Sequence, residues 1–179
     1  MTRRDEQGFS LIELMVTVAI LAIIAGIAAP SFVNLIRGNR VTSAANELVA
    51  LLQVARSGAI SNRATATVCP SSDGSTCAAA TGNRWIATMT KNGVTTVLRD
   101  STFSSGVAVT ASANLSGANN KLTFTPNGFS AAGANTSGTV GICVGALSGQ
   151  NDIDVSANIG RISTARRAAT SACTAPGDN

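Results

Sequence analysis

The chain has 179 residues, of which 45% are hydrophobic and 12% charged, so its length suits one compact domain with an appendage. It contains no histidine, which excludes Ser-His-Asp and Cys-His catalysis and every metal site built on imidazole. The formal net charge of +4 is compatible with an anionic partner but does not require one.

The hydrophobic residues are concentrated near the N-terminus, where residues 14–29 form a run without a charge. One interpretation is a secretory signal peptide that follows two basic residues and is cleaved near residue 28 or 29. Glu13 at the start of the apolar run and Pro30 just after the cleavage point oppose it. A second interpretation is a plain membrane anchor over residues 9–33, which are enough to span a bilayer but leave Glu13 unexplained.

A third interpretation explains the whole string GFSLIEL at residues 8–14. It resembles the prepilin processing site of type IV pilins and type II secretion pseudopilins, in which a short basic leader ends in Gly before Phe, and Glu stands fifth after the cut. The resemblance implies that a prepilin peptidase cleaves after Gly8 and that Phe9 becomes the methylated N-terminus. It also implies that Glu13 pairs with the N-terminal ammonium of a neighbouring subunit and sets the register of assembly.

The helical pattern continues beyond the apolar run and ends near Asn62, because apolar residues recur at spacings of three and four. The expected buried stripe is Val41, Ala45, Leu48, Leu52, Ala55 and Ala59. The opposite face carries Arg40, Asn46, Glu47, Gln53 and Arg56. Pro30 cannot donate to the carbonyl of Gly26, so we expect a kink or local melting between them, and the resemblance implies that this break helps the anchor to bend in a filament.

After Asn62 the chain changes to short segments rich in Val, Ile and Thr, which are typical of strands. The expected strands are 64–69, 84–90, 95–99, 107–111, 122–125, 139–144, 153–156 and 159–163. Asn92-Gly93 predicts a type I′ hairpin, and the expected loops are 71–83, 113–120 and 129–138. We therefore expect an α+β protein in which a long N-terminal helix packs on a small, mostly antiparallel β-sheet head. Its expected parts are a leader (1–8), a transmembrane segment (9–33), an amphipathic helix (34–62) and a periplasmic head (63–179).

Four cysteines, Cys69, Cys77, Cys143 and Cys173, allow three pairings. A zinc site is the alternative, but the sequence has neither Cys-x-x-Cys nor histidine, so we expect no metal or other cofactor. We favour Cys69 with Cys77, which closes a polar loop, and Cys143 with Cys173, which ties a tail of low hydrophobicity to a core strand. The basic leader predicts that the head lies in the oxidising periplasm, where disulfides persist.

Three further strings narrow the resemblance: ARSGAI at 55–60, FTPNG at 124–128 and IGRI at 159–162. Their order and spacing are similar to the GspH/FimT group, which includes FimU- and FimT-type minor pilins and the H-type pseudopilin of type II secretion. The resemblance implies a pilin-like fold, a single-pass subunit of the inner membrane, and later incorporation into a pilus. The implied partners are prepilin peptidase, other minor and major pilins or pseudopilins, and an inner-membrane assembly platform.

No catalytic constellation is present, so we expect a structural protein and not an enzyme. Asp152 and Asp154 are expected on an exposed strand or turn and not as a catalytic pair. The leading hypothesis is a minor pilin that primes pilus assembly or sits in the tip complex. The H-type pseudopilin is one alternative.

A second alternative is a FimT-like minor pilin that binds DNA during natural transformation. Some proteins that this chain resembles carry a C-terminal Gly-Arg-x-Arg motif. Here Gly160-Arg161 keeps the first arginine, and Ser163 stands in place of the second. Arg166 and Arg167 follow closely, and the three arginines are candidate phosphate contacts that would not read base sequence.

Overall fold

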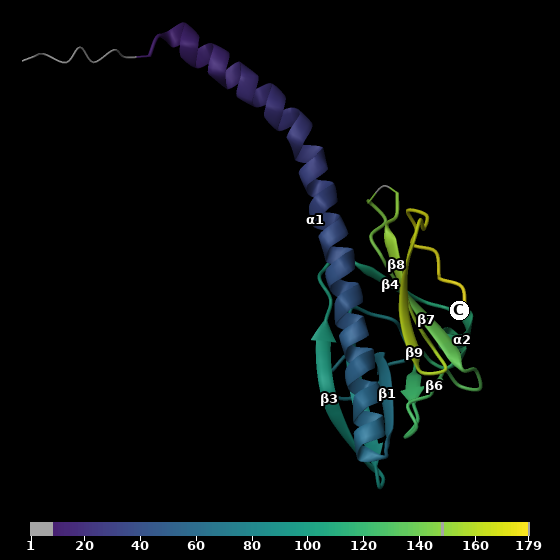
Figure 1. The fold of residues 1–179 in the computed structure, drawn as a ribbon. Coiled ribbons are helices and arrows are strands. Elements are labelled where there is room, and N and C mark those ends of the chain that lie inside the picture. The colour runs from purple at the N-terminus through teal and green to yellow at the C-terminus, as the bar shows by residue number, and fades with distance from the viewer. Residues whose placement is uncertain (1–8, 148, 179) are drawn as a thin grey trace, which may run out of the picture. The chain divides into compact units, whose positions relative to one another are not determined.

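The computed structural model describes residues 9–147 and 149–178. The chain divides into two compact units, the first ending at Ile36 and the second beginning at Arg37. One helix, α1 (Leu11–Asn62), runs through both units and ends at the residue expected from the sequence (Figure 1). It stays helical through Pro30, so local melting does not occur in this segment.

The described part of the first unit, residues 9–36, is apolar and carries no core of its own. Every side chain of residues 9–36 is exposed within the chain. Within the described residues, α1 is the one helix long and apolar enough to cross a membrane by length and composition, and none of its apolar window is buried. Such a surface must be covered from outside the chain, either by lipid or by other subunits.

In the second unit, the remainder of α1 is amphipathic and carries one wall of the hydrophobic core. All six residues of the expected stripe are buried, and so are Ala44 and Leu51. The same core contains Trp85, Phe124 and Ile142 from the strands. The second half of α1 is therefore held to the strands by apolar packing, as the 3.6-residue periodicity predicts.

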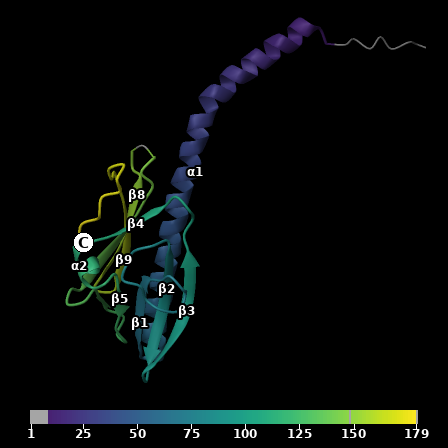
Figure 2. The same cartoon turned by 180° about the vertical axis from the view of Figure 1, so that it is seen from behind.

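The first of two sheets, sheet A, has five antiparallel strands in the order β3-β2-β1-β5-β6. They are β1 (Thr65–Pro70), β2 (Arg84–Lys91), β3 (Val94–Thr102), β5 (Leu122–Phe124) and β6 (Ser130–Ala131). Figures 1 and 2 show strands β1 and β3 running beside the second half of α1. The β2–β3 hairpin turns at Asn92 and Gly93, whose φ angles of 51° and 79° are those of the predicted type I′ turn.

The second sheet, sheet B, has four antiparallel strands in the order β4-β7-β8-β9. They are β4 (Ala108–Ala111), β7 (Ser137–Cys143), β8 (Asp152–Asn158) and β9 (Arg161–Arg167). Side chains alternate between its faces, and one face contributes Val140, Ile142, Ile153 and Val155 to the core. The other face, called the outer face below, carries Asp152 and Asp154.

Three expectations about the secondary structure of the head are wrong. A short helix, α2 (Ala113–Gly117), lies in the expected loop 113–120, because the single apolar residue Leu115 is fully buried and anchors the turn to the core. Strand β6 lies in the expected loop 129–138 and pairs with β5. Ile159 and Gly160, expected to begin a strand, form the turn between β8 and β9 with φ angles of 48° and 78°.

Candidate functional site

The described chain begins with a reciprocal pair of hydrogen bonds at the start of α1. The backbone N–H of Glu13 donates to Ser10 Oγ at 3.3 Å, and the backbone N–H of Ser10 donates to a Glu13 carboxylate oxygen at 3.4 Å. This is a capping box, in which the first residue before the helix and the third residue within it satisfy each other's free N–H groups. Ser10 was not among the expected site residues, although Ser-x-x-Glu at residues 10–13 is the sequence signal for this cap.

The capping box holds the carboxylate of Glu13, the one charged residue among residues 9–36, at the N-terminal end of the apolar helix. A carboxylate is favoured there by the helix dipole and the unpaired N–H groups. Phe9 precedes the pair and is 86% exposed. Gly8, the predicted cleavage point, lies outside the described residues.

The first disulfide joins Cys69 at the end of β1 to Cys77, as expected from the sequence. The loop between them contains a turn around Asp73, whose carboxylate accepts the backbone N–H groups of Ser75 and Thr76 at 2.8 Å each. These bonds hold the pKa of Asp73 well below its usual range. The loop is therefore closed by a covalent bond and ordered internally by a buttressed turn.

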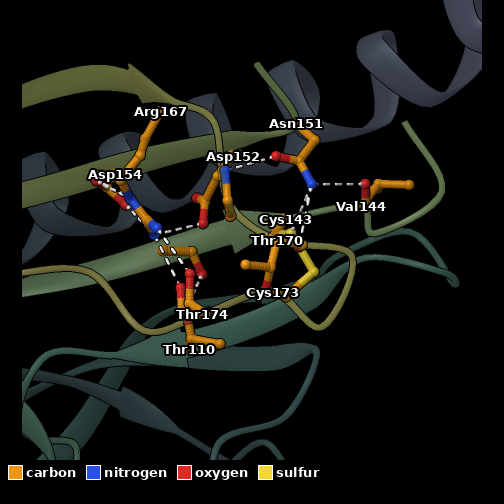
Figure 3. The surroundings of a disulfide bond; sticks show 12 residues. Thr110, Cys143, Val144, Asn151, Asp152, Asp154, Arg167, Thr170, Cys173 and Thr174 are labelled. Carbon is orange, nitrogen blue, oxygen red and sulfur yellow. Dashed lines mark hydrogen bonds and ion pairs between the residues drawn. A yellow bond between two sulfur atoms is a disulfide. The ribbon is translucent and has the colours of Figure 1, made fainter. Parts of the chain in front are cut away.

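The second disulfide joins Cys143 at the end of β7 to Cys173, again the expected pair (Figure 3). We call residues 168–178 the C-terminal strap. Beyond Cys173 the strap runs over the outer face of sheet B, where a Cβ on Gly141 would come within 3.2 Å of Pro176. At its end, the Asp178 carboxylate accepts the backbone N–H of Asn114 in α2 at 3.1 Å.

An ion cluster lies at the base of the strap. The Arg167 guanidinium donates to Asp152 at 2.6 Å and to Asp154 at 2.8 Å, and it also donates to the carbonyl of Thr174 in the strap at 3.0 Å (Figure 3). The expectation that Asp152 and Asp154 are exposed is wrong, because their side chains are 0% and 7% exposed. The positive charge of Arg167 offsets part of the desolvation free energy that burial of the two carboxylates costs.

Asn151, which was not among the expected site residues, fixes the other side of the strap. Its residue exposure is 2%, and its side-chain oxygen accepts the backbone N–H of Ala169 at 2.8 Å. Its side-chain nitrogen faces the carbonyls of Val144 and Thr170 at 3.5 Å (Figure 3). No local sequence pattern identifies this residue, since its partners come from two separate segments, the end of β7 and the strap.

We expect the ion cluster to make stability depend on pH. Burial raises the pKa of Asp152 to about 6, because lost hydration outweighs the attraction of Arg167, and the neighbouring Asp154 carboxylate adds to the rise. Unfolding returns this group to a pKa of about 3.9. The folded state therefore binds the proton more tightly, so the stabilisation is complete below about pH 4 and is lost as the pH rises through about 6.

The measurement is a denaturant titration of the full chain at a series of pH values across this window. The free energy of unfolding should decrease with rising pH in the native chain, and Asp152→Asn should flatten that decrease. An identical slope in Asp152→Asn would contradict the assignment to this carboxyl group.

The structure does not bring the three candidate DNA-contacting arginines together. Arg161 and Arg167 share the outer face of β9 but stand six residues apart, which is roughly 20 Å along a strand. The guanidinium of Arg167 is already paired with the carboxylates of Asp152 and Asp154. Arg166 faces the other way and donates to Thr42 of α1 at 3.2 Å.

The three internal strings do meet in space, around the side chain of Arg56. A Cβ on Gly128 would lie 2.8 Å from Ile60 and 3.4 Å from Arg56 Nε, and a Cβ on Gly160 would overlap the carbonyl oxygen of Gly128. Both glycines have a φ of 78°. The close approach of the two turns therefore requires glycine at both positions.

An exposed apolar helix that continues into an amphipathic half, packed on antiparallel sheets, is the architecture of pilin-like subunits. The family model for Type II transport protein GspH matches residues 44–159, and that for the prokaryotic N-terminal methylation motif matches residues 3–29. The chain therefore belongs to the GspH/FimT/FimU-like minor pilin family.

Two crystal structures of the type IV minor pilin FimU from Pseudomonas aeruginosa strain PAO1 are similar to the chain. The form in space group P21 has 27% identity and a TM-score of 0.50, and covers 70% of this chain and 87% of FimU. The form in space group P65 has 27% identity and a TM-score of 0.51, and covers 69% of this chain and 91% of FimU. No curated protein matches the chain.

The family and fold are those of structural proteins. Membership implies contact with other pilins and, through the methylation motif, processing by prepilin peptidase. The apolar N-terminal helix and the motif together indicate a membrane-anchored pilin.

Proposed function

We propose that the protein is a minor pilin that enters a type IV pilus, where it primes assembly or sits in the tip complex. The observation that carries the proposal is the capping box, which holds the Glu13 carboxylate at the start of an exposed apolar helix. A lone carboxylate is costly in a bilayer or an apolar filament core unless a cation pairs with it. Cleavage after Gly8 creates such a cation, the ammonium of Phe9, and a neighbouring subunit presents it to Glu13.

Before assembly, the subunit is inserted in the inner membrane through residues 9–33, with the head in the periplasm. Two disulfides in the head fit that oxidising compartment. Prepilin peptidase and an inner-membrane assembly platform are its processing and assembly partners. Pro30 lies within the inserted segment, where its missing N–H lets the helix adjust as subunits pack together.

The second candidate is the H-type pseudopilin of a type II secretion system, which the description of the matching family model favours. The similarity to FimU, a type IV minor pilin, favours the pilus. Cross-linking of the native chain in its own cells separates the two, because the captured neighbours are pilins in one case and pseudopilins in the other. No contact among the described residues favours DNA binding, which stays a sequence-based prediction.

The test of the pilus proposal is incorporation into sheared filaments. We expect Glu13→Ala and Glu13→Gln to reduce incorporation at least tenfold, since loss of a buried charge pair costs several kcal/mol. Glutamine can still close a capping box, so Glu13→Gln isolates the charge. Ser10→Ala should cost about 1 kcal/mol of helix stability and leave incorporation largely intact.

Processing provides the control. Each variant should still carry a cleaved, methylated Phe9 by mass spectrometry, whereas replacement of Gly8 by a bulky residue should leave the chain uncut and outside the filaments. Normal incorporation of Glu13→Gln would refute the charge-pairing model, and normal incorporation of an uncut Gly8 variant would refute the processing step.

A further inference from the structure

Three arginines lie around the first turns of α1 in the second unit, which begins at Arg37. Arg37 donates to the carbonyl of Ala146 at 2.8 Å, and Arg40 donates to the carbonyl of Ser105 at 3.4 Å. Arg166 reaches α1 from β9 through Thr42 at 3.2 Å. We call Arg37, Arg40 and Arg166 the arginine collar, because Arg37 and Arg40 share one face of α1, whereas Arg166 contacts Thr42, roughly 140° around the helix from Arg37.

The three guanidinium groups of the collar are each held in position by a contact with another segment of the chain. Each guanidinium is fixed by a hydrogen bond to a neutral oxygen, which positions the cation without neutralising it. Thr42 is itself anchored to the carbonyl of Gly38 at 3.1 Å. Each of the three guanidinium groups therefore keeps donors for an anionic ligand.

No carboxylate among the described residues pairs with the collar. The carboxylates of the second unit are engaged elsewhere: Glu47 with Arg99, Asp100 with Arg84, Asp152 and Asp154 with Arg167, Asp73 with its own turn, and Asp178 with Asn114. The collar is thus a local excess of three positive charges. Its natural partner is an anion supplied from outside the chain.

The position of the collar in the sequence selects the partner. Arg37 and Arg40 follow Val33, the expected end of the membrane segment, by four and seven residues, or about 6 and 10 Å of helix. The polar headgroup layer on each side of a bilayer is about 5–8 Å thick. Arg37 therefore falls within the headgroup layer, and Arg40 lies just beyond its outer edge, from which a long side chain tilted toward the helix N-terminus reaches the lipid phosphates.

We propose that the arginine collar binds the headgroups of anionic phospholipids while the subunit waits in the membrane. The inference rests on the proposed membrane insertion and goes beyond it, because a neutral bilayer would hold the apolar segment equally well. Bound lipid phosphates would hold the head at the membrane surface, and they would be exchanged for other contacts when the subunit leaves the bilayer.

The experiment places the full chain in nanodiscs of phosphatidylcholine containing a minor fraction of phosphatidylglycerol. Native mass spectrometry then measures the enrichment of phosphatidylglycerol among retained lipids. Removal of one arginine near a charged surface lowers anionic lipid binding about fivefold. We therefore expect Arg37→Gln/Arg40→Gln/Arg166→Gln to abolish the enrichment, and each single variant to reduce it.

The matched control is Arg63→Gln/Lys91→Gln/Lys121→Gln, which removes the same charge from places outside the collar and should retain the enrichment. Equal enrichment in the collar variant and the native chain, or equal loss in the control, would overturn the proposal.

Displacement of phosphatidylglycerol by dilute inorganic phosphate would assign a free-anion site instead. Collar-dependent DNA binding without lipid preference would assign a nucleic-acid surface. Failure of the native chain to enter neutral nanodiscs would count against membrane insertion itself.

Discussion

Replacement of Arg167 by methionine is expected to lower the free energy of unfolding by about 3–5 kcal/mol at pH 8, because it leaves two buried carboxylates without a cation. Among the described residues, this one guanidinium donates every side-chain hydrogen bond that Asp152 and Asp154 accept. The loss should be smaller at pH 5, where Asp152, whose pKa burial raises to about 6, takes up a proton instead. Urea titrations of the full chain in detergent at the two pH values measure both effects.

Arg161→Met is the matched control, since Arg161 lies on the same strand and the same face but is exposed and has no ion pair among the described residues. It should change stability by less than about 0.5 kcal/mol. Arg167→Lys should lie between the two, because one ammonium cannot form the fork that reaches both carboxylates. The triple variant Arg167→Met/Asp152→Asn/Asp154→Asn should recover part of the loss. Equal stability of Arg167→Met and Arg161→Met would show that the cluster contributes nothing.

Opening the second disulfide has the next largest expected effect. The double variant Cys143→Ser/Cys173→Ser releases a cross-link between residues 30 apart, which in the chain-entropy estimate removes about 3.5 kcal/mol. Cys69→Ser/Cys77→Ser releases a separation of only 8 and should remove about 2.5 kcal/mol. Denaturant titrations under non-reducing conditions check the order of the two values.

The location of the change distinguishes the two disulfides further. Without Cys143–Cys173, amide hydrogen exchange should accelerate in the C-terminal strap and at Asn114, whose N–H is bonded to Asp178. Without Cys69–Cys77 the change should stay around the Asp73 turn. Because the strap also holds Arg167 through Thr174, the Cys143/Cys173 and Arg167 variants should be non-additive. Strictly additive losses of unfolding free energy would contradict the idea that the disulfide and the ion cluster hold the strap together as one unit.

Features that rest on neighbouring residues were predicted correctly. The buried stripe of α1 follows from the spacing of Val41 to Ala59, and the β2–β3 turn follows from Asn92-Gly93, because both depend on local geometry. The capping box belongs to this class and was missed only because Glu13 was interpreted through assembly alone. By contrast, α2 was missed because one apolar residue, Leu115, creates no period.

By itself, the sequence determined the apolar helix with its single charge, the amphipathic continuation and the family, since hydrophobic period and short motifs are properties of adjacent residues. Only the tertiary structure decided which charges are free. It buried Asp152 and Asp154 against Arg167 and left Arg166 beside α1. Charge pairing depends on residues that are far apart in the sequence and are brought together by strand register and by the strap. Register is set by the packing of the whole head and not by any one segment.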